Sequence, residues 1–257
     1  MPTVEWDPAQ YERFRRERTL PFEDLLALVK PRPGMRVVDL GCGTGELTRR
    51  LHEALSARET IGLDTSEGML AKSAGFAGGG LSFLRQDVGT WEPDGAFDLV
   101  FSNAALHFVP DHERLFARLA SALAPEGQVA AQIPANQDFA THRVATEVAG
   151  EEPFATLLGG WSHPDNRLAP EEYARLLDRL GFPEMNVRMQ VYTHRLPSRD
   201  DVFEWVKGSL LNEYKARLSP ADFEAFLARY RERLLARLPD ARPFFFTFKR
   251  LLLWAGR

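Results

Sequence analysis

The stretch Val37-Val38-Asp39-Leu40-Gly41-Cys42-Gly43-Thr44-Gly45 decides the fold of this chain. Its apolar start predicts a buried strand, and the residues after Gly45 repeat leucine at helical spacing. Between them, the alternate glycines allow a sharp turn and let the backbone approach a ligand without a Cβ in the way. The first turn of the helix then presents unpaired N–H groups. We therefore expect a strand, a glycine turn and a helix that bind a nucleoside-bearing cofactor.

The spacing of the glycines disfavours a dinucleotide. Dinucleotide folds use G-x-G-x-x-G, with the pyrophosphate at the helix N-terminus. In this chain the third glycine comes one residue earlier, and Glu46 stands where the dinucleotide pattern has glycine. An acidic side chain repels a pyrophosphate, whereas Asp39 at the strand end suits a ligand with an ammonium group. The pattern therefore favours S-adenosylmethionine, which carries an ammonium and a sulfonium but no phosphate, over a nicotinamide cofactor.

Composition is that of an ordinary enzyme rather than of a nucleic-acid or membrane protein. The chain has 257 residues, 44% of them apolar, and a formal net charge of −4, whereas nucleic-acid binders are usually basic. No apolar run approaches the roughly 20 residues that span a bilayer, and the N-terminus lacks an apolar signal region. The lone Cys42 excludes an internal disulfide, and we interpret it as a small buried residue rather than a nucleophile. We expect a cytoplasmic protein, a monomer or weak homodimer, that acts on a small molecule without nucleic-acid, membrane or metal partners.

The first 130 residues alternate short apolar runs with helical patterns, which is typical of βα units around a parallel sheet. We expect an α/β fold with a doubly wound, seven-stranded, mostly parallel sheet. It forms a single domain over 1–257, with an N-terminal helical cover at 1–30 and helical insertions that cap the site at 135–182 and 198–240. The expected strands are Met35–Leu40, Thr60–Asp64, Leu81–Leu84, Phe97–Ser102, Gln128–Ile133, Met185–Thr193 and Phe244–Trp254.

Carboxylates follow two of these strands. Asp64 ends the second strand, 23 residues after Gly41, where a carboxylate can accept hydrogen bonds from ribose hydroxyls. Asp87 follows the third strand and can accept from an adenine amine while Val88 offers its backbone N–H. Met69 either packs against the adenosine or is a core residue. The residues expected to bind the cofactor are Asp39, Gly41, Gly43, Gly45, Asp64, Thr65, Met69, Asp87, Val88 and Asn103.

The segment after the fourth strand should flank the transferred group. Its residues overhang the carboxyl edge of the sheet, where ligands bind in open α/β folds. Asn103 can orient cofactor or substrate there. His107 has two interpretations: it is a general base if the nucleophile is a hydroxyl, and otherwise a packing residue or an anion-binding donor.

These features resemble the class I S-adenosylmethionine-dependent methyltransferases, and within them the trans-aconitate 2-methyltransferase family. Phe108 departs from that family's pattern, in which we expect tryptophan. The segments that carry the resemblance, besides the glycine motif, Asp64 and Asp87, are Trp6-Asp7-Pro8, Gly62-Leu63-Asp64-Thr65-Ser66-Glu67-Gly68-Met69, Phe101-Ser102-Asn103-Ala104-Ala105-Leu106, Val109-Pro110-Asp111-His112, Gln132-Ile133-Pro134 and Leu196-Pro197-Ser198.

The resemblance implies a carboxyl O-methyltransferase that esterifies one carboxylate of a small polycarboxylic acid such as trans-aconitate. An ionised carboxylate needs no general base, so no catalytic residue is required, and the site needs groups that hold the remaining carboxylates. Two alternatives stay open: a natural-product O- or N-methyltransferase with His107 as base, and a catalytically silent S-adenosylmethionine-binding protein. The candidates for substrate binding are Tyr11, Arg18, His107, Trp161, His163, Tyr192 and Arg195.

Overall fold

The computed structural model describes residues 15–257, and the chain forms two compact units. Within the described residues, the sheet unit comprises Arg16–Pro134, Asn166–Gln190 and Arg250–Arg257, and the helical unit comprises Ala135–Asp165 and Val191–Lys249. Each unit is considered by itself below. The helices and strands are α2 (Arg15–Leu26), β1 (Arg36–Leu40), α3 (Glu46–Leu55), β2 (Glu59–Asp64), α4 (Glu67–Ser73), η1 (Ala74–Phe76), β3 (Leu81–Arg85), β4 (Phe97–Asn103), η2 (Leu106–Phe108), α5 (His112–Ser121), β5 (Leu123–Pro134), α6 (Ala140–Ala149), α7 (Phe154–Leu157), α8 (Pro170–Arg179), β6 (Glu184–Leu196), α9 (Asp200–Lys207), α10 (Asn212–Lys215), α11 (Pro220–Arg237) and β7 (Phe244–Gly256).

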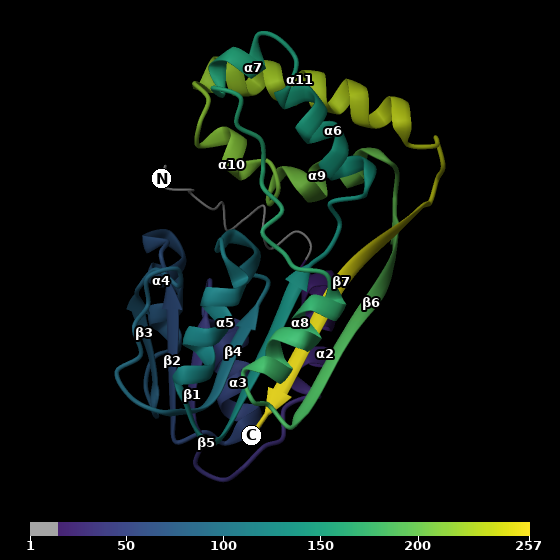
Figure 1. Cartoon of the computed structure of the whole chain (residues 1–257). Coiled ribbons are helices and arrows are strands. Elements are labelled where there is room, and N and C mark those ends of the chain that lie inside the picture. Colours follow the sequence, from purple (N-terminus) through teal and green to yellow (C-terminus); the bar gives the residue numbers. More distant parts are fainter. Residues whose placement is uncertain (1–14) are drawn as a thin grey trace. The chain divides into compact units, whose positions relative to one another are not determined.

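The sheet confirms the expected fold class. Its seven strands lie in the order β3-β2-β1-β4-β5-β7-β6, and the strands from β3 to β5 pair in parallel (Figure 1). β7 runs antiparallel to β5, with Gln132 opposite Leu252 and Pro134 opposite Arg250. Every expected strand is present. β5 begins earlier than expected, at Leu123, because the chain enters the sheet directly after α5 and pairs Leu123 with Phe97 before a register shift.

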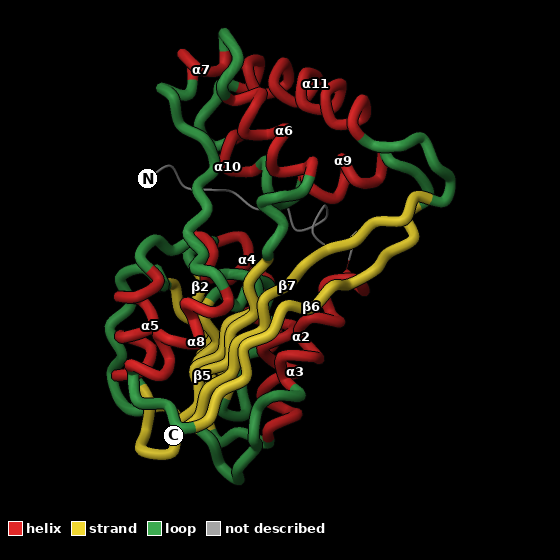
Figure 2. Tube along the Cα trace, turned by 45° about the vertical axis from the view of Figure 1, so that its right-hand side comes forward, coloured by secondary structure: helices red, strands yellow, loops and turns green. Residues whose placement is uncertain are grey.

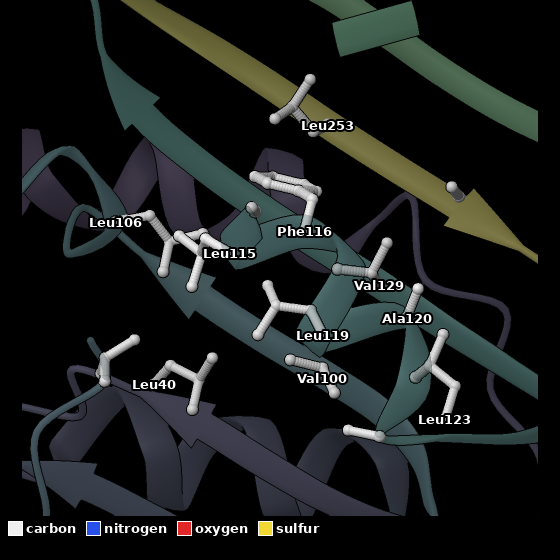
Figure 3. Close-up of a cluster of buried hydrophobic side chains, with 14 of the residues drawn as sticks. Leu40, Val100, Leu106, Leu115, Phe116, Leu119, Ala120, Leu123, Val129 and Leu253 are labelled. Atoms are coloured by element: carbon white, nitrogen blue, oxygen red, sulfur yellow. The ribbon is translucent and has the colours of Figure 1, made fainter. Parts of the chain in front are cut away.

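Helices cover both faces of the sheet. On one face, α5 places Leu115, Phe116 and Leu119 against strand residues such as Val100 and Val129, as Figure 3 shows. The opposite face is covered by α2 and α3, whose apolar side chains form a second cluster with alternate residues of β1, β4, β5 and β7. This alternation is the burial pattern of a sheet covered on both faces.

The helix α8 corrects one expected boundary. It was expected within a cap over 135–182, and the sequence rightly places its start at Pro170 and its apolar stripe on Tyr173, Leu176 and Leu177. Those residues, however, are buried in the sheet cluster together with α5. α8 is therefore a flanking helix of the sheet, and only the part of the expected insertion up to Asp165 belongs to the helical unit.

The helical unit has its own apolar core. The helices α6, α7, α9, α10 and α11 surround it together with the Leu196 end of β6 and the Phe244 end of β7 (Figure 2). At its centre Phe226 is fully buried, with Tyr214 stacked on it at 4.7 Å between ring centroids and Phe154 packed edge-on at 5.3 Å. The expected insertion at 198–240 thus lies in this unit.

The turn between β1 and α3 has the geometry that its glycines predict. Gly41, Gly43 and Gly45 all have left-handed backbone, with φ of 78°, 56° and 79°. A Cβ on Gly41 would lie 2.2 Å from the Cβ of Ala105, in the segment after β4, whereas a Cβ on Gly43 would have nothing within 4 Å. The turn therefore packs against the end of β4 at one glycine and is open at the next.

The different surroundings of Gly41 and Gly43 allow the cost of backbone strain to be measured apart from the cost of overpacking. Both Gly41→Ala and Gly43→Ala force a left-handed backbone on alanine, which costs about 1–2 kcal/mol. Only Gly41→Ala also overpacks the contact with Ala105, which adds roughly 1–3 kcal/mol. We expect urea unfolding to show the larger loss of stability for Gly41→Ala. Equal losses would mean that Ala105 moves aside freely and that the packing interpretation is wrong.

Candidate cofactor and substrate site

The end of β2 holds the glycine turn in place. The backbone N–H groups of Gly41 and Cys42 donate to the carbonyl of Leu63 at 2.8 and 2.9 Å. One carboxylate oxygen of Asp64, Oδ2, accepts the N–H of Gly43 at 2.9 Å, and Oδ1 accepts the N–H of Ser66 at 2.9 Å. Asp64 lies where the sequence predicts a ribose-binding carboxylate, and these two amides fix the orientation of its oxygens.

Asp39 lies beneath this turn and is almost completely buried, with 4% of its surface exposed. Its Oδ2 accepts the Thr48 hydroxyl at 2.6 Å. Burial is the largest cause that raises the pKa of Asp39, to about 7; the nearby Asp64 charge also raises it, and the hydrogen bond from Thr48 lowers it. A cationic ligand would favour the ionised form, so the environment suits the ammonium-binding role that the sequence predicts.

Cys42 is a buried, neutral thiol. Burial is the main cause that raises its pKa, and the charges of Asp39 and Asp64 act in the same direction. Nucleophilic cysteines need the opposite, a pKa lowered toward neutrality. The structure thus agrees with the interpretation of Cys42 as a small filler between two glycines.

The adenosine-binding candidates differ in exposure. Met69 on α4 is buried, and Thr65 is exposed beside Asp64. Asp87 is also exposed, and its Oδ1 accepts the N–H of Gly89 at 2.7 Å. Val88 is buried, and its carbonyl accepts from the Arg118 guanidinium at 2.8 Å. These contacts order the loop after β3, and the predicted adenine contacts of Asp87 and Val88 stay predictions.

The end of β4 and the residue after it lie at the same edge of the sheet as the turn. The Ser102 hydroxyl donates to the carbonyl of Leu40 at 2.7 Å, and the Ala104 N–H donates to the carbonyl of Gln132 at 2.9 Å. Ala104 has a left-handed φ of 59°, a strained conformation for alanine. Between them, the Asn103 Oδ1 is buried with no hydrogen-bond partner among the described residues.

A buried histidine and tyrosine hold the next turn. His112 Nε2 lies 3.0 Å from the Leu106 carbonyl, and its Nδ1 contacts the Tyr173 hydroxyl. Because a carbonyl only accepts, Nε2 carries the proton and Nδ1 accepts from Tyr173. The side chain of Asn166 donates to the His107 carbonyl at 3.0 Å. The loop that carries His107 is thereby fixed through its backbone. The sequence places Tyr173 on the apolar face of a helix and His112 in a segment of the family resemblance, but it indicates neither as a residue of the site.

Two of the substrate candidates lie together in the helical unit. The rings of Trp161 and His163 are 6.5 Å apart, and the His163 N–H donates to the Tyr214 hydroxyl at 3.2 Å. The Arg217 guanidinium lies 3.7 Å from the centroid of the Trp161 ring and 3.3 Å from a carboxylate oxygen of Glu213. The sequence did not indicate Arg217 or Tyr214. The i, i+4 spacing of Glu213 and Arg217 is a signal for an ion pair, but not for its packing on a loop tryptophan.

Of the remaining substrate candidates, the structure describes the two side chains on β6. Tyr192 is buried on β6, whereas Arg195 is exposed and belongs to the opposite face of the strand. Tyr11 lies outside the described residues, as does the side chain of Arg18. Each of these four stays a candidate from the sequence alone.

The residues at the carboxyl edge of the sheet unit fit an adenosyl cofactor. Gly43 leaves open space where a side chain would stand, Asp64 holds oriented lone pairs, and Asn103 has a buried acceptor atom without a partner among the described residues.

In the described part of the chain, no helix is long and apolar enough to cross a membrane. Residues 15–257 also contain no group of three His, Cys, Asp or Glu side chains that could hold a metal ion.

The buried carboxyl of Asp39 predicts a pH dependence of stability. Its pKa is about 7 in the folded protein and ordinary in the unfolded chain, so between about pH 4 and 7 the folded protein holds a proton that the unfolded chain releases. The free energy of unfolding therefore falls as pH rises through this window, by up to about 1.4 kcal/mol per pH unit. We expect Asp39→Asn, which cannot ionise, to remove this decline in urea unfolding. Parallel pH profiles of variant and wild type would contradict the raised pKa.

Comparison with known proteins agrees with this geometry. Residues 37–127 match the family model described as a methyltransferase domain. Solved structures share the fold: the YcgJ protein from Bacillus subtilis has a TM-score of 0.62 at 16% identity and covers 93% of this chain and 98% of its own. A methyltransferase from Mesorhizobium loti has a TM-score of 0.52 at 24% identity, covering 91% of this chain and 96% of its own.

Full-length relatives give the family. The trans-aconitate 2-methyltransferase of Deinococcus radiodurans is 43% identical and covers 98% of both chains. The enzyme of that name from Streptomyces avermitilis is 40% identical and covers 98% of this chain and 97% of its own. The Escherichia coli enzyme is 33% identical and covers 98% of both. The chain belongs to the trans-aconitate 2-methyltransferase family.

Proposed function

We propose that this protein transfers the methyl group of S-adenosylmethionine to one carboxylate of trans-aconitate and releases the monomethyl ester. The observation that carries the proposal is the 43% identity to a trans-aconitate 2-methyltransferase over 98% of both chains. The glycine turn held by Asp64 and the buried Asp39 support it from the structure.

The reaction asks the protein to bind and orient rather than to move protons. When bound, S-adenosylmethionine supplies a methyl group on a positively charged sulfur; a carboxylate oxygen forms the new C–O bond as the C–S bond breaks. The carboxyl groups of an acid such as trans-aconitate are ionised at neutral pH, so no residue must act as a base. The chain therefore contributes by holding the acid in line with the methyl group and by excluding water.

The ordered edge of the sheet unit serves this positioning. Backbone hydrogen bonds fix the glycine turn on β2, and Asn166 fixes the loop of His107. A displacement of about 1 Å can cost a hundredfold in rate, so such fixed loops matter even where they carry no reactive group. We further propose that the protein acts on this small acid in the cytoplasm, as a monomer or weak homodimer; its net charge of −4 gives it no attraction for nucleic acid.

A panel of small di- and tricarboxylates tests the acceptor. We expect release of S-adenosylhomocysteine with trans-aconitate, and a product heavier by one methylene by mass spectrometry, at a higher kcat/KM than with the other acids. Asp64→Ala is the control, because it should weaken S-adenosylmethionine binding in calorimetry. Turnover only with hydroxyl or amine acceptors would indicate a natural-product methyltransferase, and cofactor binding without any turnover a silent binding protein.

Replacement of His107 tests whether a base is needed. In carboxyl methylation we expect His107→Ala to lower kcat by no more than about tenfold, or ~1.4 kcal/mol in the barrier. The ring lies against Phe108, 3.9 Å between centroids, so some loss from changed packing is expected. A much larger loss with intact cofactor affinity would contradict a mechanism without a base.

A further inference from the structure

Two neighbouring strands of the sheet unit bury polar atoms that the described residues leave without partners. Gln132 on β5 is 1% exposed, and its donor Nε2 has no hydrogen-bond partner in the part of the chain that the structure describes. The same holds for the buried acceptor Oδ1 of Asn103, the last residue of β4. Buried polar groups are almost always hydrogen-bonded in folded proteins, so each exception calls for an explanation. A ligand that supplies the missing partners is one.

Strand register places these groups in one row. Asn103 is directly opposite Gln132, and Gln132 is opposite Leu252 on β7. Because alternate residues of a strand share a face, Arg250 lies on the same face as Leu252 and Gln132. Arg250 is 7% exposed and thus brings a buried positive charge to this row. Figure 1 shows β4 and β5 ending at the same edge of the sheet, with β7 running past in the opposite direction.

The hydrogen-bonding groups and charge in this row differ from one strand to the next. Asn103 offers an acceptor oxygen, which suits an ammonium group, whereas Gln132 offers a donor and Arg250 a cation, which suit a carboxylate. The sheet order β2-β1-β4-β5 puts Gln132 three strands from Asp64, about 14 Å at ordinary strand spacing. The predicted ribose and glycine-turn contacts occupy β2 and β1, so the donors on β5 and β7 lie on the side away from the adenosine.

We propose that the Gln132 amide and the Arg250 guanidinium bind a carboxylate of the acceptor acid, one that is not methylated. The inference rests on the proposed function and adds the residues that recognise the substrate class. Gln132 donates its Nε2–H to a carboxylate oxygen, and Arg250 supplies the charge that makes an acid preferable to its neutral ester. Asn103, next in the row, lies toward the cofactor. Its acceptor oxygen suits the ammonium group of the cofactor and not a carboxylate of the acid.

The variant Gln132→Met tests this, because methionine keeps the length of the side chain and removes the donor. We expect KM for trans-aconitate to rise tenfold or more, kcat to change less than threefold, and the Kd of S-adenosylmethionine in calorimetry to stay within twofold. The thermal midpoint of the free protein should not fall, since no internal hydrogen bond is lost. A merely structural glutamine would give the reverse: lower stability and an unchanged KM.

Gln128 provides a matched control on the same strand and face. Its side chain is buried, and both of its polar atoms have partners: Oε1 accepts from Lys30 N–H at 2.8 Å and from Trp254 Nε1 at 2.9 Å, and Nε2 donates to the Lys30 carbonyl at 2.7 Å. Gln128→Met should therefore lower the thermal midpoint and leave KM unchanged.

A binding measurement keeps this inference distinguishable from the proposed function. Trans-aconitate, added with S-adenosylhomocysteine, should raise the thermal midpoint of the wild type and of Gln128→Met but not of Gln132→Met. An equal shift in Gln132→Met, or a weakened Kd for S-adenosylmethionine in that variant, would overturn the inference while the function stands. No shift and no turnover in the wild type would overturn the proposed function, and the inference with it.

Discussion

The hydrogen bonds between the glycine turn and the end of β2 are the constraint on which the candidate site depends. Asp64 accepts the Gly43 N–H, while the carbonyl of Leu63 accepts two more amides of the turn. A carboxylate that accepts amides from two loops has its remaining lone pairs in fixed directions. The group expected to bind ribose thus also shapes the turn, so loss of this carboxylate would disturb the two strand ends together.

Much of the sheet could be predicted because its strands are buried on both faces. Such strands contain short apolar runs, as in Leu99-Val100-Phe101 of β4, and they stand out between helical patterns. β5 shows the limit. Its first residues, Leu123-Ala124-Pro125-Glu126-Gly127, have the composition of a turn; of these, Leu123 pairs with Phe97 on β4, and the register shifts before Gln128 pairs with Leu99. Pairing across the sheet is a tertiary property that the local sequence does not carry.

The candidate site could be predicted where one segment carries the information, and not where distant segments meet. The glycine turn and Asp64 follow from position relative to their strands. The apolar stripe of α8 predicts that it buries a face but not against which partner, which is why its boundary was wrong. The packing of Arg217 on Trp161 likewise joins the turn after α10 to a loop far away in sequence. Side chains alternate between the two faces of a strand, so Tyr192 and Arg195, three residues apart, belong to opposite faces of β6.

The unfavourable features of the sheet unit gather at one edge. Asp39 is a buried carboxyl with a raised pKa, Ala104 has a left-handed backbone, and the side chains of Asn103 and Gln132 bury atoms without partners among the described residues. Nearer the start of β5, the buried Gln128 has hydrogen-bond partners at both its amide oxygen and its amide nitrogen. A buried glutamine on this strand can therefore find hydrogen-bond partners. Gln132 differs from Gln128 in its position at the carboxyl end of the strand, not in residue type. Strain and unmet polarity of this kind persist where a ligand completes the structure, because the stability of the free protein is then not what selection preserves.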